Sequence, residues 1–377
     1  MNKEKSNEIS SRPFFDNLNG LRFVGALAVL IFHCFALERE MWGDFFHNYW
    51  FQKVYFLTGK GHLGIILFFV LSGFLITYIL LWENRKNGRI NLLNYLMRRF
   101  LRVWPLYFLV VLFGFFLFPV LPYGIETIHE LWRFVLFFSN IDEIILGAND
   151  PINFLTATWT VSVEEQFYLT WGALIGLISF RKKSTYYIFF IAIIIGSLVF
   201  RYFHLGDNRV LYFHTLSVMS DLAFGGIIGL FAFSGKAQMI FEKLTRWQII
   251  FFYIIAGLLF TFEGHIFKGV LFTFERFVPG LIFAFVILEQ VYAKKSFYKI
   301  DKVPYFFTSG ELTYGFYMFH CIYIFYWSTF FKNNHYTEHL WQFLLYCLVV
   351  FVSTYFTAYL SLHFYERPFL KLKRYFR

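Results

Sequence analysis

The strongest constraint on the fold of this chain is a series of about ten apolar segments, each near the 20 residues that a helix needs to cross a bilayer. They cover residues 18–37, 62–82, 104–121, 157–179, 186–204, 211–232, 247–262, 270–291, 312–331 and 339–363. The composition agrees, because 58% of the 377 residues are hydrophobic and only 15% are charged. Backbone polar groups cannot stay unpaired in hydrocarbon, so such segments fold as helices. The sequence predicts an all-α, polytopic membrane bundle of about ten transmembrane helices.

Basic residues predict the topology of this bundle. If both termini are cytoplasmic, 24 of the 34 Lys and Arg fall on the inner side, as the positive-inside rule requires. We therefore expect a cytoplasmic N-terminal segment (1–16), a membrane domain (17–368) and a basic cytoplasmic tail (369–377). A further apolar stretch, 131–146, is short and interrupted by polar residues, so we expect a re-entrant or interfacial helix there. The net charge of +10 reflects this topology and not nucleic-acid binding.

The termini and the cysteines exclude other classes. No removed signal peptide is expected, because residues 1–16 lack an apolar stretch with a cleavage site. The three cysteines, Cys34, Cys321 and Cys347, all lie in apolar segments. An odd number of thiols in spans predicts neither a disulfide framework nor a zinc site, and we expect no metal.

The first span contains two ionisable residues, Arg22 and His33. Eleven residues at 100° each make three turns plus about 20°, so both side chains share one helix face, roughly 16 Å apart along the axis. Arg22 is expected at the membrane surface and His33 deep in the bilayer. Because an ionisable group at that depth is costly, it indicates a functional site. The alternative is a structural histidine bonded to a neighbouring helix.

An arginine cluster follows in the next inner loop. Arg99 and Arg102 are three residues apart and share a helix face, with Arg98 beside them. Guanidinium groups at a membrane surface suit bidentate phosphate binding, although positive charge also anchors inner loops. Since Arg22 approaches from the same side, we favour an anionic ligand held by these arginines.

Two adjacent carboxylates, Glu164 and Glu165, lie six or seven residues inside the span that starts near residue 157. This depth is roughly 10 Å, close to that expected for His33. A carboxylate placed against an imidazole fixes its tautomer and raises its basicity, which makes a general base. We favour Glu164 as the partner of His33. Alternatively, one glutamate pairs with a buried arginine for stability.

Small and polar residues in two other spans complete the set. Ser72 and Gly73 lie near the middle of the second span, where small residues let helices approach closely or leave room for a narrow substrate. A second intramembrane histidine, His320, lies in the ninth span.

Six segments of the chain together resemble a known family. They are Leu18-Asn-Gly-Leu-Arg22 followed by His33, Phe69-Val-Leu-Ser-Gly-Phe-Leu-Ile76, Arg98-Arg-Phe-Leu-Arg-Val-Trp-Pro105, Trp159-Thr-Val-Ser-Val-Glu-Glu-Gln-Phe-Tyr168, Tyr314-Gly-Phe-Tyr-Met-Phe-His320 and Tyr365-Glu-Arg-Pro368. In this order they resemble the acyltransferase family 3 integral-membrane acyltransferases of bacteria. The resemblance covers residues 17–368 and implies a protein of the bacterial cytoplasmic (inner) membrane.

The resemblance also implies an activity. Family members carry an acyl group, commonly acetyl, from cytoplasmic acyl-CoA to a hydroxyl of an extracytoplasmic acceptor, often a cell-envelope glycan or lipid-linked sugar. By this resemblance His33 matches the essential histidine, and Arg22, Arg99 and Arg102 match the conserved arginines. Some relatives add a soluble esterase-like domain. The sequence ends at Arg377, so a step that needs such a domain is expected to require a partner protein.

The residues give this chemistry a physical form. We expect the arginines to hold the phosphates of coenzyme A while its thin arm passes Ser72 and Gly73 to reach His33. His33, oriented by Glu164, then removes the proton of the acceptor hydroxyl. No cofactor is expected to stay bound. The sequence leaves open whether an acyl-histidine intermediate forms. It also leaves open which side chain stabilises the oxyanion, the candidates being Ser72, Ser162 and Gln166. The alternative function is a transporter or flippase in which the buried His and Glu relay protons.

Overall fold

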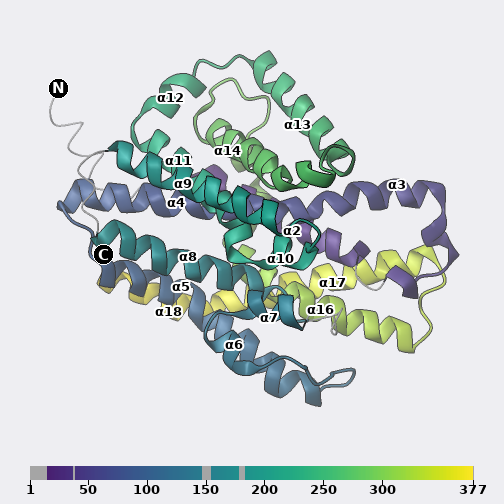
Figure 1. Ribbon diagram of the computed structural model, residues 1–377. Coiled ribbons are helices and arrows are strands. Elements are labelled where there is room, and N and C mark those ends of the chain that lie inside the picture. The colour runs from purple at the N-terminus through teal and green to yellow at the C-terminus, as the bar shows by residue number, and fades with distance from the viewer. Residues whose placement is uncertain (1–14, 37–38, 147–153, 178–182, 377) are drawn as a thin grey trace.

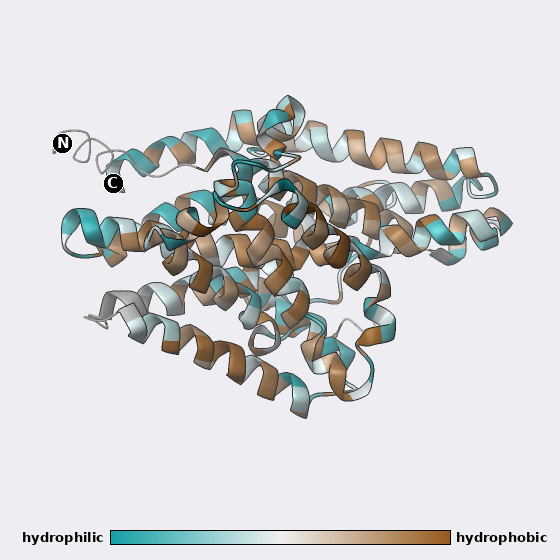
Figure 2. Cartoon of the chain, turned by 90° about the horizontal axis from the view of Figure 1, so that it is seen from above, coloured by the Kyte–Doolittle hydropathy of each residue, from teal (hydrophilic) through white to brown (hydrophobic). Residues whose placement is uncertain are grey.

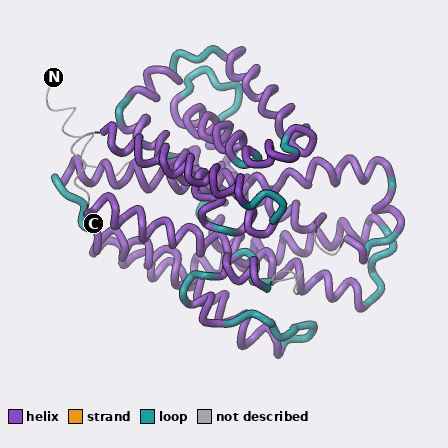
Figure 3. Tube along the Cα trace, viewed as in Figure 1, coloured by secondary structure: helices purple, strands orange, loops and turns teal. Residues whose placement is uncertain are grey.

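The structure is a computed structural model that describes residues 15–36, 39–146, 154–177 and 183–376 (Figure 1). The long helices are α2 (Asp16–Ala36), α4 (Leu63–Asn87), α5 (Leu92–Leu112), α8 (Thr158–Leu177), α9 (Lys183–Phe203), α11 (Thr215–Phe233), α13 (Arg246–Ile266), α14 (Phe277–Tyr292), α16 (Thr313–Asn333) and α17 (Leu340–Leu360). The described ranges contain helices and loops and no strand (Figure 3). The predicted all-α membrane bundle is thus confirmed.

Shorter elements connect these helices. The short α-helices are α3 (Tyr49–Thr58), α6 (Leu131–Val135), α7 (Ser139–Ile145), α10 (Asn208–Phe213), α12 (Lys236–Phe241), α15 (Pro304–Ser309) and α18 (Arg367–Leu372). The 3₁₀ and π turns are η1 (Arg39–Met41), η2 (Asp44–His47), η3 (Gly59–His62), η4 (Phe113–Leu117), η5 (Phe118–Val120), η6 (Gly269–Phe274), η7 (Ile300–Lys302), η8 (Ser361–Glu366) and η9 (Lys373–Phe376).

Eight helical stretches in the described residues are long and apolar enough to cross a membrane. The other two expected spans, α8 and α16, are 20 and 21 residues long and hold polar side chains of the site described below. Seen from above, hydrophobic residues concentrate along the middle of the bundle and hydrophilic residues toward its two ends (Figure 2). This distribution is the one that a bilayer imposes on a multi-pass protein.

The interrupted apolar stretch 131–146 does not form a span. It folds into α6 and α7, of 5 and 7 residues, which are too short to cross a bilayer. Its polar side chains are turned inward: Asp142 is fully buried, receives a 2.7 Å hydrogen bond from Arg133 and pairs with His129. The polar residues that interrupt the hydropathy therefore anchor two short helices to the bundle, and whether this segment is re-entrant or interfacial stays a prediction.

The first and last described segments meet at one end of the bundle, which we call the terminal end. Phe15 and Leu18, at the start of the described residues, line the same cavity as Lys373. The Arg98 side chain donates a 2.6 Å hydrogen bond to the carbonyl oxygen of Phe376. An even number of spans between them accounts for this arrangement, as the topology prediction required.

Glycines allow α4 and α11 to pack backbone against backbone. A Cβ atom on Gly73 would lie 2.0 Å from the carbonyl oxygen of Leu222, and one on Gly225 would lie 2.1 Å from that of Val70. Only glycine fits at such a contact, which is the usual role of small residues between membrane helices. Of the two roles that the sequence allowed for Gly73, close helix packing is therefore the one observed. Gly73 does not line the cavities described below, so it does not make room for a substrate there.

Three buried clusters meet around α2 and α16. Val29 of α2 packs in a cluster with α4, α8, α11 and α14, while Leu30 of α2 packs in a second cluster with α16 and α17. Met318 of α16 belongs to a third cluster with α5 and α6. The residues between these clusters are held from all sides, which gives the candidate site a rigid frame.

Candidate active site

Three arginines from two helices meet at the terminal end. Arg22 comes from α2, and Arg99 and Arg102 come from α5. All three line two adjoining cavities: the terminal cavity, of about 300 Å³, and the central cavity, of about 110 Å³. The sequence predicted that these arginines would share one site, and the structure brings them together at the junction of the two cavities.

These guanidinium groups are not neutralised by carboxylates. Within the described ranges, Arg22, Arg99 and Arg102 form no ion pair, although Arg99 lies over the ring of Tyr168, 5.2 Å from its centroid. Arg102 is solvent-exposed in the cavity. Three guanidinium groups held close together, with the Glu164 carboxylate as a neighbour in the central cavity but not in an ion pair with them, leave an excess of positive charge that suits a polyanion such as a phosphate group.

Arg98 differs from its neighbours. Its side chain is buried, pairs with Glu83 of α4 and holds the carbonyl oxygen of Phe376. Although Arg98 also lines the terminal cavity, its charge is already matched. Arg98 was grouped with the anion-binding arginines in the sequence, but in the structure it ties the C-terminal segment to α4 and α5.

The central cavity is lined by Ser72 and Glu164, among others. The Ser72 hydroxyl donates a 2.6 Å hydrogen bond to one oxygen of Glu164, and the Tyr168 hydroxyl donates a 2.8 Å hydrogen bond to the other. Glu164 is therefore a fixed carboxylate in the wall of the cavity. Glu165 points elsewhere: it is buried and accepts a 3.0 Å hydrogen bond from the indole N–H of Trp104 on α5.

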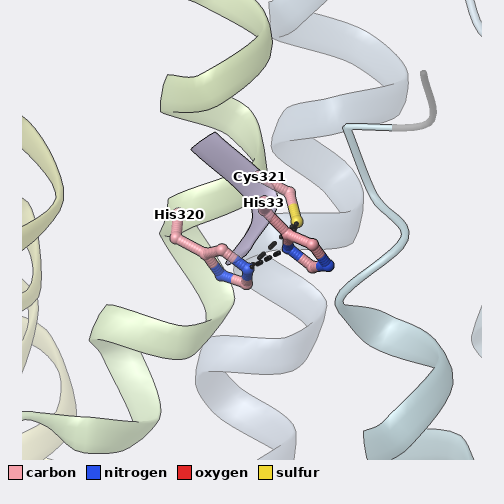
Figure 4. Close-up of side chains that lie close together, drawn as sticks. All are labelled: His33, His320 and Cys321. Atoms are coloured by element: carbon pink, nitrogen blue, oxygen red, sulfur yellow. Dashed lines mark hydrogen bonds between the residues drawn. The ribbon is translucent and has the colours of Figure 1, made fainter. Parts of the chain in front are cut away.

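His33 pairs with a second histidine. Its Nδ1 atom lies 2.9 Å from Nε2 of His320 on α16, and the two rings are nearly parallel (Figure 4). The other ring nitrogen of His320, Nδ1, faces the carbonyl oxygen of Tyr317 one turn earlier. Sequence reasoning noted His320 but assigned it no role.

The predicted contact between His33 and Glu164 is absent. Across the residues that the structure describes, no hydrogen bond joins His33 to Glu164 or Glu165. The reason is that the histidine pair lies beside a part of α8 that is distant from the two glutamates. Cys321, beside the histidine pair, interacts with the backbone of Ala157, seven residues or roughly 10 Å before Glu164. The two helices approach from opposite ends as expected, but His33 stops short of the glutamates.

One turn of α16 joins the central cavity to the histidine pair. The Tyr317 side chain lines the cavity, and its hydroxyl accepts a 3.1 Å hydrogen bond from Thr160, another lining residue. The Tyr317 backbone carbonyl holds His320. Along α4 the lining runs from Leu75 to Phe68, about 10 Å toward the histidines.

These tyrosine and threonine residues were missed in the sequence. A usable signal existed, because Thr313, Tyr317 and His320 recur at helical spacing on one face of a span. The suggested oxyanion donors are occupied. The Ser162 hydroxyl hydrogen-bonds Ser139 at 2.7 Å, and the Gln166 amide donates to the carbonyl oxygen of Phe137 at 2.7 Å.

The histidine pair also includes a thiol. The Cys321 sulfur lies 3.3 Å from Nε2 of His320 and 3.7 Å from Nδ1 of His33. These three donor atoms lie within 4.8 Å of one another and could hold a soft divalent cation. The 2.9 Å separation of the two nitrogens is that of a hydrogen bond; two nitrogens bound to one tetrahedral zinc ion lie about 3.3 Å apart. The geometry therefore favours a hydrogen-bonded pair.

A further cavity, of about 110 Å³, shares no lining residue with the central and terminal cavities. Its lining includes His62, Tyr212 and Glu275, which carry hydrogen-bonding groups. The ring of His62, one of its lining residues, lies 5.9 Å from that of Phe32, the neighbour of His33 in the chain. We call it the distal cavity, because residues at the terminal end do not line it.

The fold and this site define a multi-pass helical membrane protein with a cationic cavity and a histidine pair of which His320 is buried and His33 partly buried. The family model described as "Acyltransferase domain" matches residues 15–361. The chain therefore belongs to this family of acyltransferase domains, as the sequence motifs indicated.

Curated relatives agree with the family. The chain is 25% identical over 391 residues to "Putative O-acetyltransferase SACOL0978" of Staphylococcus aureus strain COL, covering 98% of this chain and 60% of that protein. It is also 25% identical over 380 residues to the O-acetyltransferase OatA of S. aureus strain NCTC 8325, covering 96% of this chain and 58% of OatA. The chain thus spans about 60% of the length of these relatives. No solved structure matches the chain.

Proposed function

We propose that this protein is a membrane O-acyltransferase that moves an acyl group, most simply acetyl, from acyl-CoA to a hydroxyl group of an acceptor. The observation that carries the proposal is the set of three arginines, Arg22, Arg99 and Arg102, that form no ion pair within the described residues and lie at the junction of two cavities. One of these cavities is lined by Tyr317, whose carbonyl oxygen holds His320 beside His33. The family and the names of the relatives support the same class of reaction.

The terminal cavity would bind the phosphates of the donor. Coenzyme A carries several negative charges at one end and its thioester on a long, thin arm. Guanidinium groups hold phosphates through charge-assisted, often bidentate hydrogen bonds. The arm would continue into the central cavity, which Ser72 lines and whose volume of about 110 Å³ is smaller than the 300 Å³ of the terminal cavity. The positive-inside rule supports a cytoplasmic position for the terminal end, and acyl-CoA is made in the cytoplasm.

His33 would act as the general base. Its ring nitrogen removes the proton of the acceptor hydroxyl while the oxygen attacks the thioester carbonyl carbon. The carbon–sulfur bond then breaks, the leaving thiolate takes the proton back from the imidazolium, and an ester and free coenzyme A result. Such general-base assistance contributes typically 10²–10⁴-fold to the rate.

The acceptor would approach through the distal cavity. This cavity presents an imidazole, a phenol and a carboxylate from His62, Tyr212 and Glu275, and such groups hydrogen-bond hydroxyls. A polyhydroxylated acceptor, such as a glycan or lipid-linked sugar outside the cytoplasm, matches that lining. Donor and acceptor would then meet at His33 from opposite directions, so the transfer would cross the membrane.

The experiment is acyl transfer by the purified protein in liposomes supplied with radiolabelled acetyl-CoA and simple glycosides. We expect coenzyme A release and labelled glycoside with the wild type, turnover lost in His33→Gln with donor binding retained, and weaker donor binding in Arg99→Gln. Undiminished turnover in His33→Gln would overturn the assigned base. Absence of both binding and turnover with every acyl-CoA tested would overturn the proposed function.

A further inference from the structure

We propose that His320 is a positioning residue that fixes the tautomer of His33 and so presents Nε2 of His33 as the basic atom. This inference rests on the proposed function and names a part of the machinery that the sequence motifs alone do not assign. In this proposal His33 is oriented by a histidine that the backbone holds, and not by the glutamate that the sequence led us to expect.

The argument begins at the Tyr317 carbonyl. A carbonyl oxygen only accepts hydrogen bonds, so the ring nitrogen that faces it, Nδ1 of His320, must carry a hydrogen. His320 is 1% exposed and forms no ion pair within the described residues, so an imidazolium there would be an unmatched charge inside the bundle. The ring is therefore neutral, and its second nitrogen, Nε2, carries a lone pair.

The lone pair decides the state of His33. Nδ1 of His33 lies 2.9 Å from Nε2 of His320, and a hydrogen bond at this distance needs a donor on one side. Since His320 can only accept there, Nδ1 of His33 carries the hydrogen. The neutral His33 ring then has its own lone pair on Nε2, which points away from His320 (Figure 4).

The neighbouring thiol is compatible with this assignment. The Cys321 sulfur is 3.3 Å from Nε2 of His320, where an S–H group can donate weakly to the same lone pair. Neither glutamate of α8 competes, because within the described residues the hydrogen bonds of Glu164 are to Ser72 and Tyr168 and that of Glu165 is to Trp104, and none reaches either histidine. The chain of bonds therefore runs in one direction, from His33 to His320 to the Tyr317 carbonyl.

This arrangement has a chemical consequence. A carboxylate partner would add a negative charge beside the base, whereas a neutral imidazole orients the base without that charge. In an apolar interior, an uncharged partner avoids the cost of burying a carboxylate. If the acceptor atom at position 320 is lost, His33 is free to place its hydrogen on Nε2 and to rotate, and both changes remove the base.

The test compares two variants of His320 with a matched control. His320→Leu removes the acceptor atom, while His320→Gln supplies a side-chain oxygen that can reach Nδ1 of His33. For the control, His363→Leu makes the same change at a partly exposed histidine whose Nδ1 also meets a backbone carbonyl, that of Tyr359 at 2.9 Å. We expect kcat to fall about 10²-fold in His320→Leu with the KM for acetyl-CoA unchanged, and to recover in large part in His320→Gln.

A second measurement reads the tautomer itself. Nitrogen-15 NMR of ring-labelled histidine, with the His33 signals assigned by their loss in His33→Gln, should show a hydrogen on Nδ1 and none on Nε2. In His320→Leu this assignment should be lost or reversed. A hydrogen on Nε2 of His33 in the wild type would overturn the proposal, and so would full kcat in a folded His320→Leu variant.

The two measurements separate this proposal from the proposed function. If no acyl-CoA is turned over by any variant, the acyltransferase assignment fails, and the NMR spectrum still tests the histidine pair. If the wild type turns over acetyl-CoA and His320→Leu does so equally well, only the positioning role fails.

Discussion

The Tyr168 hydroxyl donates a 2.8 Å hydrogen bond to Glu164, one turn earlier on α8, while the Tyr168 ring faces the guanidinium group of Arg99. One tyrosine thus contacts both a carboxylate and a cation of the same cavity. Ser72 donates to the other oxygen of Glu164, and within the described residues no hydrogen bond joins His33 to Glu164. Its position in the wall instead places a negative charge near the path expected for the donor.

Glu164→Gln distinguishes these roles. Since Glu164 lines the donor path and does not touch His33, we expect the kcat of the variant to change by less than about tenfold, while the KM for acetyl-CoA changes more. Steady-state kinetics in liposomes measure both constants. A fall in kcat of about 10²-fold or more, the size expected when a general base loses its partner, would support the original His33–Glu164 pairing instead.

Neighbouring arginines should behave differently. Arg99→Gln removes a cation that has no carboxylate partner, so the affinity for acetyl-CoA should fall about 10–100-fold, as expected for one charge-assisted hydrogen bond. Arg98→Gln leaves Glu83 buried without its partner, so this variant should lose thermal stability with a smaller effect on affinity. Isothermal titration with acetyl-CoA and thermal unfolding in detergent measure the two effects. Equal losses of affinity in both variants would contradict the assignment of Arg99 to donor binding and of Arg98 to stability.

The α4–α11 contact predicts a stability effect at Gly73. In Gly73→Ala the new methyl group would meet the Leu222 carbonyl oxygen at 2.0 Å, so the helices must separate. We expect the free energy of unfolding to fall by about 1–3 kcal/mol, as in overpacked cores. Gly257→Ala on α13 is the control, because nothing lies within 4 Å of its Cβ, and it should leave stability unchanged or raise it. Unfolding followed by circular dichroism compares them, and equal stability of the two variants would argue against the contact.

Cys321 tests whether the histidine pair needs a metal ion. In a hydrogen-bonded pair the thiol contributes little, so Cys321→Ala should retain turnover within about threefold, because a thiol is only a weak donor. Treatment of the wild type with a strong chelator should likewise leave turnover unchanged. Elemental analysis of the purified protein completes the test. Stoichiometric zinc that is lost in Cys321→Ala together with activity would establish a metal site instead.

The sequence predicted much of the site because its signals are local. Helical spacing placed Arg99 and Arg102 on one face, and the cost of charge in a bilayer singled out Arg22 and His33. The structure adds that the three arginines meet at one junction. Hydropathy likewise indicated the spans, since length and apolar character are properties of each segment by itself.

The partner of His33 could not be predicted in the same way. His33 and His320 are 287 positions apart, and their contact depends on the rotation and depth of α16 against α2. Periodicity shows which residues share one face of a helix. It does not show which other helix that face contacts, or how far the two helices are shifted along their axes. Glu164 was the reasonable choice by depth alone, and its hydrogen bonds to Ser72 and Tyr168 depend on how α4 and α8 pack.

Tyr317 belongs to two parts of the molecule at once, because its ring lines the central cavity and its carbonyl holds His320. One turn of α16 therefore supplies both a wall of the cavity and the carbonyl oxygen that receives the Nδ1–H of His320. A substitution that displaces the backbone at position 317 should for this reason disturb both the cavity and the histidine pair, whereas one that only shortens the side chain should change the cavity alone.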